Sequence, residues 1–247
     1  MIARGDIEAI ERATLAGLGC DPVAAYPGWL LPKRHGPMGR AKSAVPICHD
    51  LEPDPPSLKR ILSAYREVGL APTFRMPDVT GLNETRNHLA AMGFSPGLRP
   101  THVMLADLKT VAALTEAQAS FATVADARWG AVFAGPGFDP IEGEARVRIL
   151  ASAKNTLFGQ VDVDGEAAAV GVGNYNHGWV SIHGMRTAQA ARGRGYAAAI
   201  LAGLARVGLE RGLTQAVLQV EEGNWSALNL YRRAGFQTAW RYDYWKA

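Results

Sequence analysis

Hydrophobic and polar positions in the second half of the chain follow strand and helix spacing in turn. A hairpin of two strands is expected over 157–173, because apolar residues flank an Asp-Gly turn at Asp164 and Gly165. Gly212 and Gly235 each mark the expected end of a helix. Further strands are expected over 119–126, 178–187, 215–220 and 238–245, and helices over 142–153, 196–211 and 224–234.

The sequence of the first half also predicts strands and helices. Strands are expected over 28–31, 73–76 and 101–108, helices over 57–69 and 82–94, and Pro- and Gly-rich loops over 32–40 and 52–57. Ser57 is the expected cap of the first helix, and Gly69 its end.

The two halves resemble weak copies of each other. From Gly69 to Gly93 the chain runs 24 residues through a strand and a helix, and from Gly212 to Gly235 it runs 23 residues in the same order. This order also recurs in many unrelated α/β proteins. We predict an α/β fold of two units in tandem, over 1–110 and 118–247, each with a mixed sheet.

Composition narrows the class of protein. With 48% hydrophobic and 20% charged residues, the chain has the balance of a folded, water-soluble protein. A net charge of +3 is far from the dense basic face that nucleic acid binding needs. Cys20 and Cys48 form no CxxC pair, so we expect neither a disulfide framework nor a metal site. Because no signal peptide or membrane span is evident, a cytoplasmic location is expected.

A glycine- and arginine-rich loop, Arg192 to Ala197, lies between a predicted strand and a predicted helix. Free backbone amides at a helix N-terminus bind phosphate. Glycines allow the backbone conformations that such a loop needs. Arg192 and Arg194 add positive charge. The GK[ST] ending of a P-loop is absent. Gly193, Gly195 and Ala198 match the dinucleotide pattern GxGxxA, but only about fifty residues follow, too few for the further βα units of that domain.

Two motifs together resemble the GNAT superfamily of N-acetyltransferases. Arg192, Gly195 and Ala197 fit its R/Q-x-x-G-x-G/A loop. The segment 224–236 fits its N-x-x-A-x-x-x-Y-x-x-x-G-F pattern, read as Asn224, Ala227, Tyr231, Gly235 and Phe236. The resemblance covers about 118–247 and implies the acyl-CoA N-acyltransferase fold. It also implies a tandem GNAT protein whose first unit is degenerate, because "EPDPPS" at 52–57 replaces the phosphate loop.

The resemblance implies acetyl transfer from acetyl-CoA to a primary amine of a small molecule or peptide by direct attack. Tyr231 would be the general acid, and His183 and Glu221 are candidate bases. The residues expected to bind the coenzyme are Met185, Arg186, Thr187, Arg192, Gly193, Arg194, Gly195, Tyr196, Ala197, Ala198, Asn224, Ala227 and Tyr231.

The sequence leaves other roles open for some of these residues and for the protein as a whole. Asn224 could also serve as a helix cap. Family members border the acceptor pocket with segments that here carry aromatic residues, namely Trp129, Phe133, Phe138, Trp240, Tyr242 and Tyr244. The main alternative function is a non-catalytic protein that binds or senses acyl-CoA. The sequence does not favour a nucleic acid partner, because the arginines near the motifs form no extended basic face.

Overall fold

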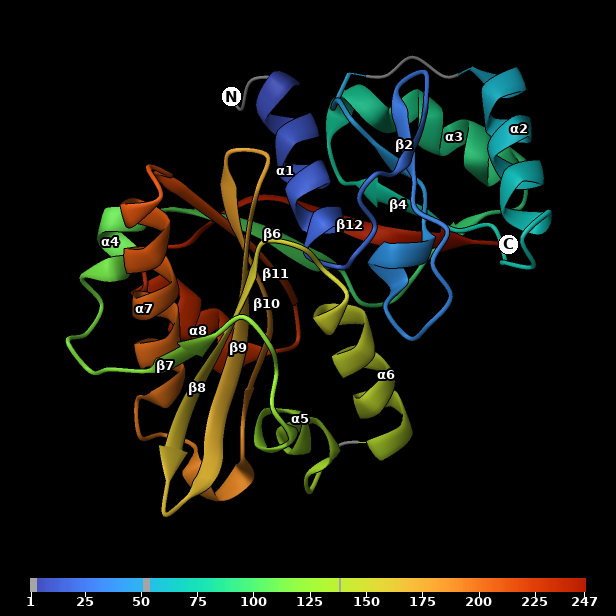
Figure 1. Cartoon of the computed structure of the whole chain (residues 1–247). Helices are drawn as coiled ribbons and strands as arrows, with labels where there is room; N and C mark the ends of the chain where they lie inside the picture. Colours follow the sequence, from blue (N-terminus) through green and yellow to red (C-terminus); the bar gives the residue numbers. More distant parts are fainter. Residues whose placement is uncertain (1–3, 51–53, 138) are drawn as a thin grey trace.

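The computed structural model describes residues 4–50, 54–137 and 139–247 (Figure 1). Its centre is a nine-stranded sheet in the order β4-β12-β6-β11-β10-β9-β8-β7, with β5 paired to β12. Among the described strands of this sheet, β10 and β11 run parallel and the other pairs are antiparallel. A separate sheet of three short strands, β1-β2-β3, belongs to the first half. The expected α/β class is confirmed, but the mixed sheet is a single one that includes strands of both halves, and the separate β1-β2-β3 sheet is antiparallel.

The second half follows the expected order of elements closely. The hairpin turns at Asp164 and Gly165, which both have positive φ. The helix α5 was not expected, and β7 is shorter than the strand predicted there. The elements are β7 (Ser120–Ala122), α5 (Ala127–Ala134), α6 (Pro140–Ala151), β8 (Thr156–Val163), β9 (Glu166–Asn176), β10 (Trp179–Thr187), η3 (Gln189–Ala191), α7 (Tyr196–Glu210), β11 (Gln215–Glu221), α8 (Trp225–Arg233) and β12 (Gln237–Lys246).

The first half differs more from expectation. Its elements are α1 (Arg4–Ala16), β1 (Ala24–Tyr26), β2 (Trp29–Leu31), η1 (Gly39–Lys42), β3 (Val45–Pro46), α2 (Pro55–Arg66), β4 (Phe74–Pro77), η2 (Thr80–Leu82), α3 (Asn83–Ala91), β5 (Ser95–Pro96), β6 (Thr101–Asp107) and α4 (Leu108–Ala112). The helix α1 was not expected. Ser57 is not the cap of α2: the helix begins at Pro55 after Asp54, and the Ser57 hydroxyl donates to the Asp54 carboxylate.

One continuous sheet joins the two halves. Strand β6, from the first half of the chain, lies between β11 and β12, and pairs Thr101–Asp107 with Glu221–Gln215 of β11. Strand β4 pairs with the far end of β12. The division into units at 1–110 and 118–247 therefore stays a prediction, and the structure adds that the two units share strands.

Helices cover both faces of this sheet (Figure 1). Alternate residues of β10 point to opposite faces, as strand geometry requires. Val180 and Ile182 pack in the cluster that contains Leu201 and Leu204 of α7. On the other face, the Ser181 hydroxyl donates to the Ala13 carbonyl of α1 at 2.9 Å. Helix α1 thus covers the face of the sheet that carries Ser181.

Candidate active site

The glycine-rich loop leads directly into α7. Gly193 and Gly195 have φ values of 78° and 81°, a region in which other residues are strained. Within the described residues, the backbone N–H groups of 193–198 donate no hydrogen bond to another group of the protein. Arg192 and Arg194 flank them and are exposed. The loop therefore presents free amides and two cations at the positive end of a helix dipole, which is a suitable site for a phosphate.

The parallel strands β10 and β11 part near their carboxyl ends. Their pairing runs from Trp179 with Gln215 to Ile182 with Leu218 and goes no further. On its other side, β10 shifts register against β9 between His183 and Arg186. Gly184 lies at this bulge with a φ of 59°. Met185, Arg186 and Thr187 follow it, at a strand end that β11 does not pair.

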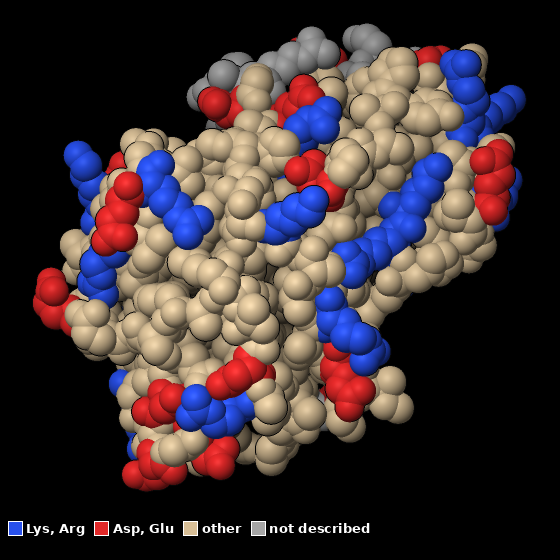
Figure 2. Space-filling model, in the orientation of Figure 1, with Lys and Arg blue, Asp and Glu red and all other residues tan. Residues whose placement is uncertain are grey.

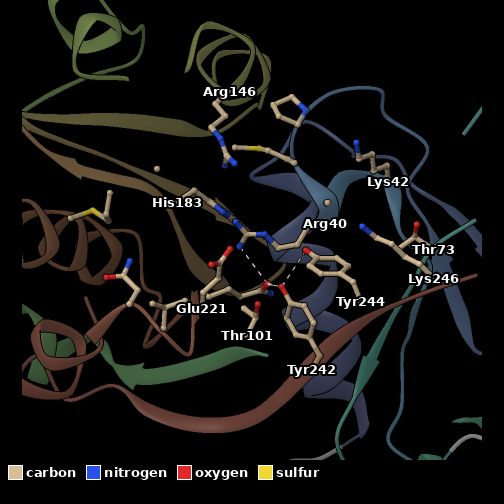
Figure 3. A pocket seen from close by; sticks show the side chains of 18 of the residues that line it. Arg40, Lys42, Thr73, Thr101, Arg146, His183, Glu221, Tyr242, Tyr244 and Lys246 are labelled. Carbon is tan, nitrogen blue, oxygen red and sulfur yellow. Dashed lines mark hydrogen bonds between the residues drawn. The ribbon is translucent and has the colours of Figure 1, made fainter. Parts of the chain in front are cut away.

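A cavity of about 820 Å³ opens where the strands part (Figure 3). Both halves of the chain line it, through segments 37–42 and 70–73 from the first half and segments 182–186 and 219–221 from β10 and β11. Asn224 and Tyr231, from the segment of the second motif, complete the wall together with the end of β12. None of the loop residues 192–198 lines this cavity.

Tyr231 is 7% exposed and faces this cavity. Its ring packs edge-on against Phe236, with centroids 6.0 Å apart. Burial raises the pKa of Tyr231 to about 12, although the positive charge of Arg40 opposes the shift. The phenol therefore keeps its proton at neutral pH and can donate it.

Asn224 is the N-cap of α8, because its side chain accepts a hydrogen bond from the Ala227 N–H at 3.2 Å. Asn224 also lines the cavity. The capping role expected from the sequence is confirmed, and its amide N–H₂ remains available for a second contact.

His183 is 5% exposed and lies under α1. Its Nε2 is 2.9 Å from the Ser181 hydroxyl, whose own proton goes to Ala13, so Nε2 must be the donor. Nδ1 then carries the lone pair, and within the described residues it has no partner. Burial and the charge of Arg40 lower the pKa of His183 to about 3. His183 is therefore neutral and a weak base.

Glu221 ends β11 at the rim of the same cavity and is exposed. A solvent-accessible carboxylate can take a proton and pass it to water. Of the two candidate bases, Glu221 has the more suitable environment. Both lie in one cavity with Tyr231, as Figure 3 shows for His183 and Glu221.

The sequence interpretation missed Arg40. Its Nη1 lies 3.4 Å from Oε1 of Gln219 on β11, and the hydroxyl of Tyr242 donates to the same oxygen at 2.8 Å. The charge of Arg40 adds to the burial that lowers the pKa of His183 and opposes the burial that raises the pKa of Tyr231. The segment 32–40 was interpreted only as a loop, although its glycines and cations were visible. Nothing in the sequence indicated that it folds against β11.

The aromatic residues divide between the cavity and the core. Phe133, Tyr242 and Tyr244 line the cavity, and Arg186 lies over the Phe133 ring at 4.7 Å. Trp129 and Trp240 are buried in hydrophobic clusters and do not line it. Phe138 lies outside the described residues.

Surface charge, helix length and the grouping of possible metal ligands are relevant to which partners the protein binds. Figure 2 shows Lys and Arg side chains interspersed with Asp and Glu on one face, several of them along a line at the right of the view. In the part of the chain that the structure describes, no helix is long and apolar enough to cross a membrane. Within 4–50, 54–137 and 139–247, no three His, Cys, Asp or Glu side chains cluster to hold a metal ion.

Comparison with solved structures shows what fold this is. The chain is similar to a GCN5-related N-acetyltransferase from Kribbella flavida, with a TM-score of 0.67, 20% identity, and coverage of 97% of this chain and 95% of that one. It is also similar to a tandem GNAT protein from the clavulanic acid biosynthesis pathway, with a TM-score of 0.62, 14% identity, and coverage of 98% and 93%. A search of curated proteins found no match.

A protein family described as "Probable histone acetyltransferase Rv0428c C-terminal" matches residues 4–245. The match includes both halves of the chain, the glycine-rich loop and the cavity lining except Lys246 and Ala247. The chain therefore belongs to this acetyltransferase family and has the fold of the GNAT acetyltransferases.

Proposed function

We propose that the chain is an N-acetyltransferase that moves an acetyl group from acetyl-CoA to a primary amine by direct attack. The observation that carries the proposal is the combination of a free-amide loop at the start of α7 with strands β10 and β11 that part beside a cavity. Membership in an acetyltransferase family supports acyl transfer in general. The bound coenzyme would supply a thioester, which is an activated acyl donor.

The coenzyme fits the groups that this chain offers. The amides of Gly193 to Ala198, including those of Tyr196 and Ala197, would bind the pyrophosphate, with Arg192 and Arg194 alongside. Backbone groups of Met185 to Thr187 on the side that β11 leaves open would bind the amides of the pantetheine arm. Asn224 would offer its side-chain amide, and the small Ala227 would leave room beside it.

Two groups in the cavity fit the proton transfers. Tyr231 holds a proton in a buried hydroxyl that faces the cavity and would donate it to the departing thiolate. Glu221 would take the proton that the attacking amine loses, directly or through water. His183 would accept a hydrogen bond from the amine at Nδ1, without taking the proton, because its pKa of about 3 makes it a weak base.

The first half would be a degenerate GNAT unit without its own coenzyme site. Pro55 and Pro56 begin α2 at the place that matches the loop, and proline has no amide proton to offer a phosphate. Glu52 and Pro53 of the same stretch lie outside the described residues. This half would instead complete the acceptor cavity, to which it contributes segments 37–42 and 70–73.

The test is a thiol-release assay with acetyl-CoA and a broad panel of primary amines. We expect turnover of at least one amine, and we expect Tyr231→Phe to lower kcat while leaving the Kd of coenzyme A unchanged. A matched control, Tyr26→Phe, removes a hydroxyl far from the cavity lining. Tight coenzyme binding with no turnover of any amine would favour the alternative, a non-catalytic acyl-CoA sensor. Unchanged kcat in Tyr231→Phe would remove the proposed acid.

A further inference from the structure

The acceptor cavity is strongly cationic. Among the described residues, five cationic side chains line it, Arg40, Lys42, Arg146, Arg186 and Lys246, against the carboxylates of Glu221 and of the terminal Ala247. The neutral His183 does not change this balance. Because a concave site with low-dielectric walls focuses the field of its charges, this excess favours an anionic ligand.

Three of these cations form no ion pair with a carboxylate of the described residues. Arg146 pairs with Glu142 in α6. Within the described residues, by contrast, no carboxylate lies within 4.0 Å of Arg40, Lys42 or Lys246. Other partly buried arginines do pair with a carboxylate, as Arg12 does with Glu8 and Arg86 with Asp78. The positive charge of these three cavity-lining side chains is therefore not paired with a carboxylate of the described residues.

The loop that carries Arg40 and Lys42 is held in place. Gly39 lies so close to Tyr244 that a Cβ there would be 2.9 Å from the ring carbon that bears the hydroxyl. The Lys42 ammonium donates to the Gly36 carbonyl at 2.6 Å, and Arg40 contacts Gln219 of β11. The cations are thus presented by a constrained turn from the first half and by the end of β12.

These cations are separate from the phosphate loop. None of the residues 192–198 lines the cavity, so the free amides of α7 and the three cations are two different anion sites. The pantetheine arm between them carries no charge. The coenzyme that the loop would hold therefore does not account for the charge of Arg40, Lys42 and Lys246.

We propose that the acceptor amine carries an oxyanion, a carboxylate or a phosphate, which Arg40, Lys42 and Lys246 bind. This inference rests on the proposed function and names the class of its acceptor. Figure 3 shows Lys42, Thr73 and Lys246 together on one side of the cavity, with Arg40 between them and Glu221. The amine would lie toward Glu221 and the oxyanion toward the two lysines. A polyamine or a lysine-rich peptide would meet like charges there, which is unfavourable.

Matched amine pairs test the proposal. Each pair differs by the oxyanion alone: phosphoethanolamine against ethanolamine, and phenylalanine against phenethylamine. A lysine-rich histone tail peptide is added as a cationic acceptor. We expect the oxyanion-bearing member of at least one pair to have a kcat/KM roughly tenfold or more above the partner that lacks the oxyanion, as a charged hydrogen bond would give. The pair that shows the preference identifies phosphate or carboxylate as the oxyanion.

A double variant, Lys42→Gln with Lys246→Gln, removes two of the cations. We expect the ratio of kcat/KM for the oxyanion-bearing amine to kcat/KM for its partner without the oxyanion to fall at least tenfold in this variant. Lys59→Gln is the matched control, because Lys59 is exposed on α2 and does not line the cavity. The ratio should stay within twofold of the unmodified protein in that control.

A binding measurement separates this inference from the proposed function. With the loop saturated by coenzyme A, calorimetric titration of phosphoethanolamine, phenylalanine and ethanolamine needs no turnover. Tighter binding of an anionic amine, lost in the double variant, supports the cation site even if no amine is acetylated. Equal or tighter binding of ethanolamine, or a histone peptide that exceeds every anionic amine in kcat/KM, overturns it.

Discussion

Replacing His183 should change both the stability of the fold and the dependence of that stability on pH. The imidazole is 5% exposed, contacts Ser181 through Nε2, and lies where any side chain on Gly17 would collide with it. Burial lowers its pKa from the ordinary value of 6.5 to about 3. In the unfolded chain the same imidazole has its ordinary pKa, so unfolding takes up a proton whenever the pH is between these two values.

The size of the pH effect on the free energy of unfolding follows from the difference between the folded and unfolded pKa values of His183. Because the folded pKa is the lower one, the stability that the neutral His183 provides is fully present above about pH 6.5 and is lost as the pH falls toward 3. Between pH 7.5 and pH 5 the shift from 6.5 to about 3 removes about 2 kcal/mol from the free energy of unfolding. His183→Gln has no proton to bind and should escape this loss.

The assay is urea unfolding of both proteins at pH 7.5 and pH 5. At pH 7.5 we expect His183→Gln to lower the free energy of unfolding by about 1–3 kcal/mol, through lost packing and an altered bond to Ser181. At pH 5 this difference should shrink by about 2 kcal/mol, since only the unmodified protein takes up the proton. His35→Gln, at an exposed histidine, controls for the loss of one histidine. A difference that is the same at both pH values would refute the buried neutral imidazole.

Three further substitutions probe the site. Tyr231→Phe should lower kcat by about 100-fold or more, the range of a lost general acid, and a kcat within threefold of the unmodified enzyme would contradict this role. Gly195→Ala places a Cβ where φ is 81°, so it should destabilise the folded protein by about 1 kcal/mol and raise the Kd of coenzyme A. An unchanged Kd in calorimetry would argue against this loop as the coenzyme site. Gly39→Ala should push the loop away from Tyr244 and raise the KM of the best acceptor amine, with the coenzyme Kd as the internal control. An unchanged KM would show that the loop does not shape the acceptor site.

Local sequence determined much of the second half of this fold. The Asp-Gly turn at Asp164, the helix α7 after Gly195 and the cap at Asn224 each depend on backbone preferences of a few neighbouring residues. Such preferences act at short range, so the pattern alone was enough to predict them. The loop amides at the start of α7 follow from the same rule, because the first turn of any helix leaves its donors free.

Contacts between residues far apart in the sequence determined the strand order of the sheet and the burial of His183. The insertion of β6 between β11 and β12 depends on strand pairing across more than a hundred residues, which no local pattern records. The burial that makes His183 neutral arises from α1 above it, and a strand pattern does not indicate what will cover a given face.

The cavity shows most clearly what the sequence and the tertiary structure each decided. The sequence by itself determined the glycine-rich loop before α7 and the tyrosine on α8, because both lie in short motifs. Only the tertiary structure brought Arg40 and Lys42 from one half against Glu221 and Lys246 from the other. Charges act through space, so the character of the acceptor site depends on which segments the fold places together, and not on their order along the chain.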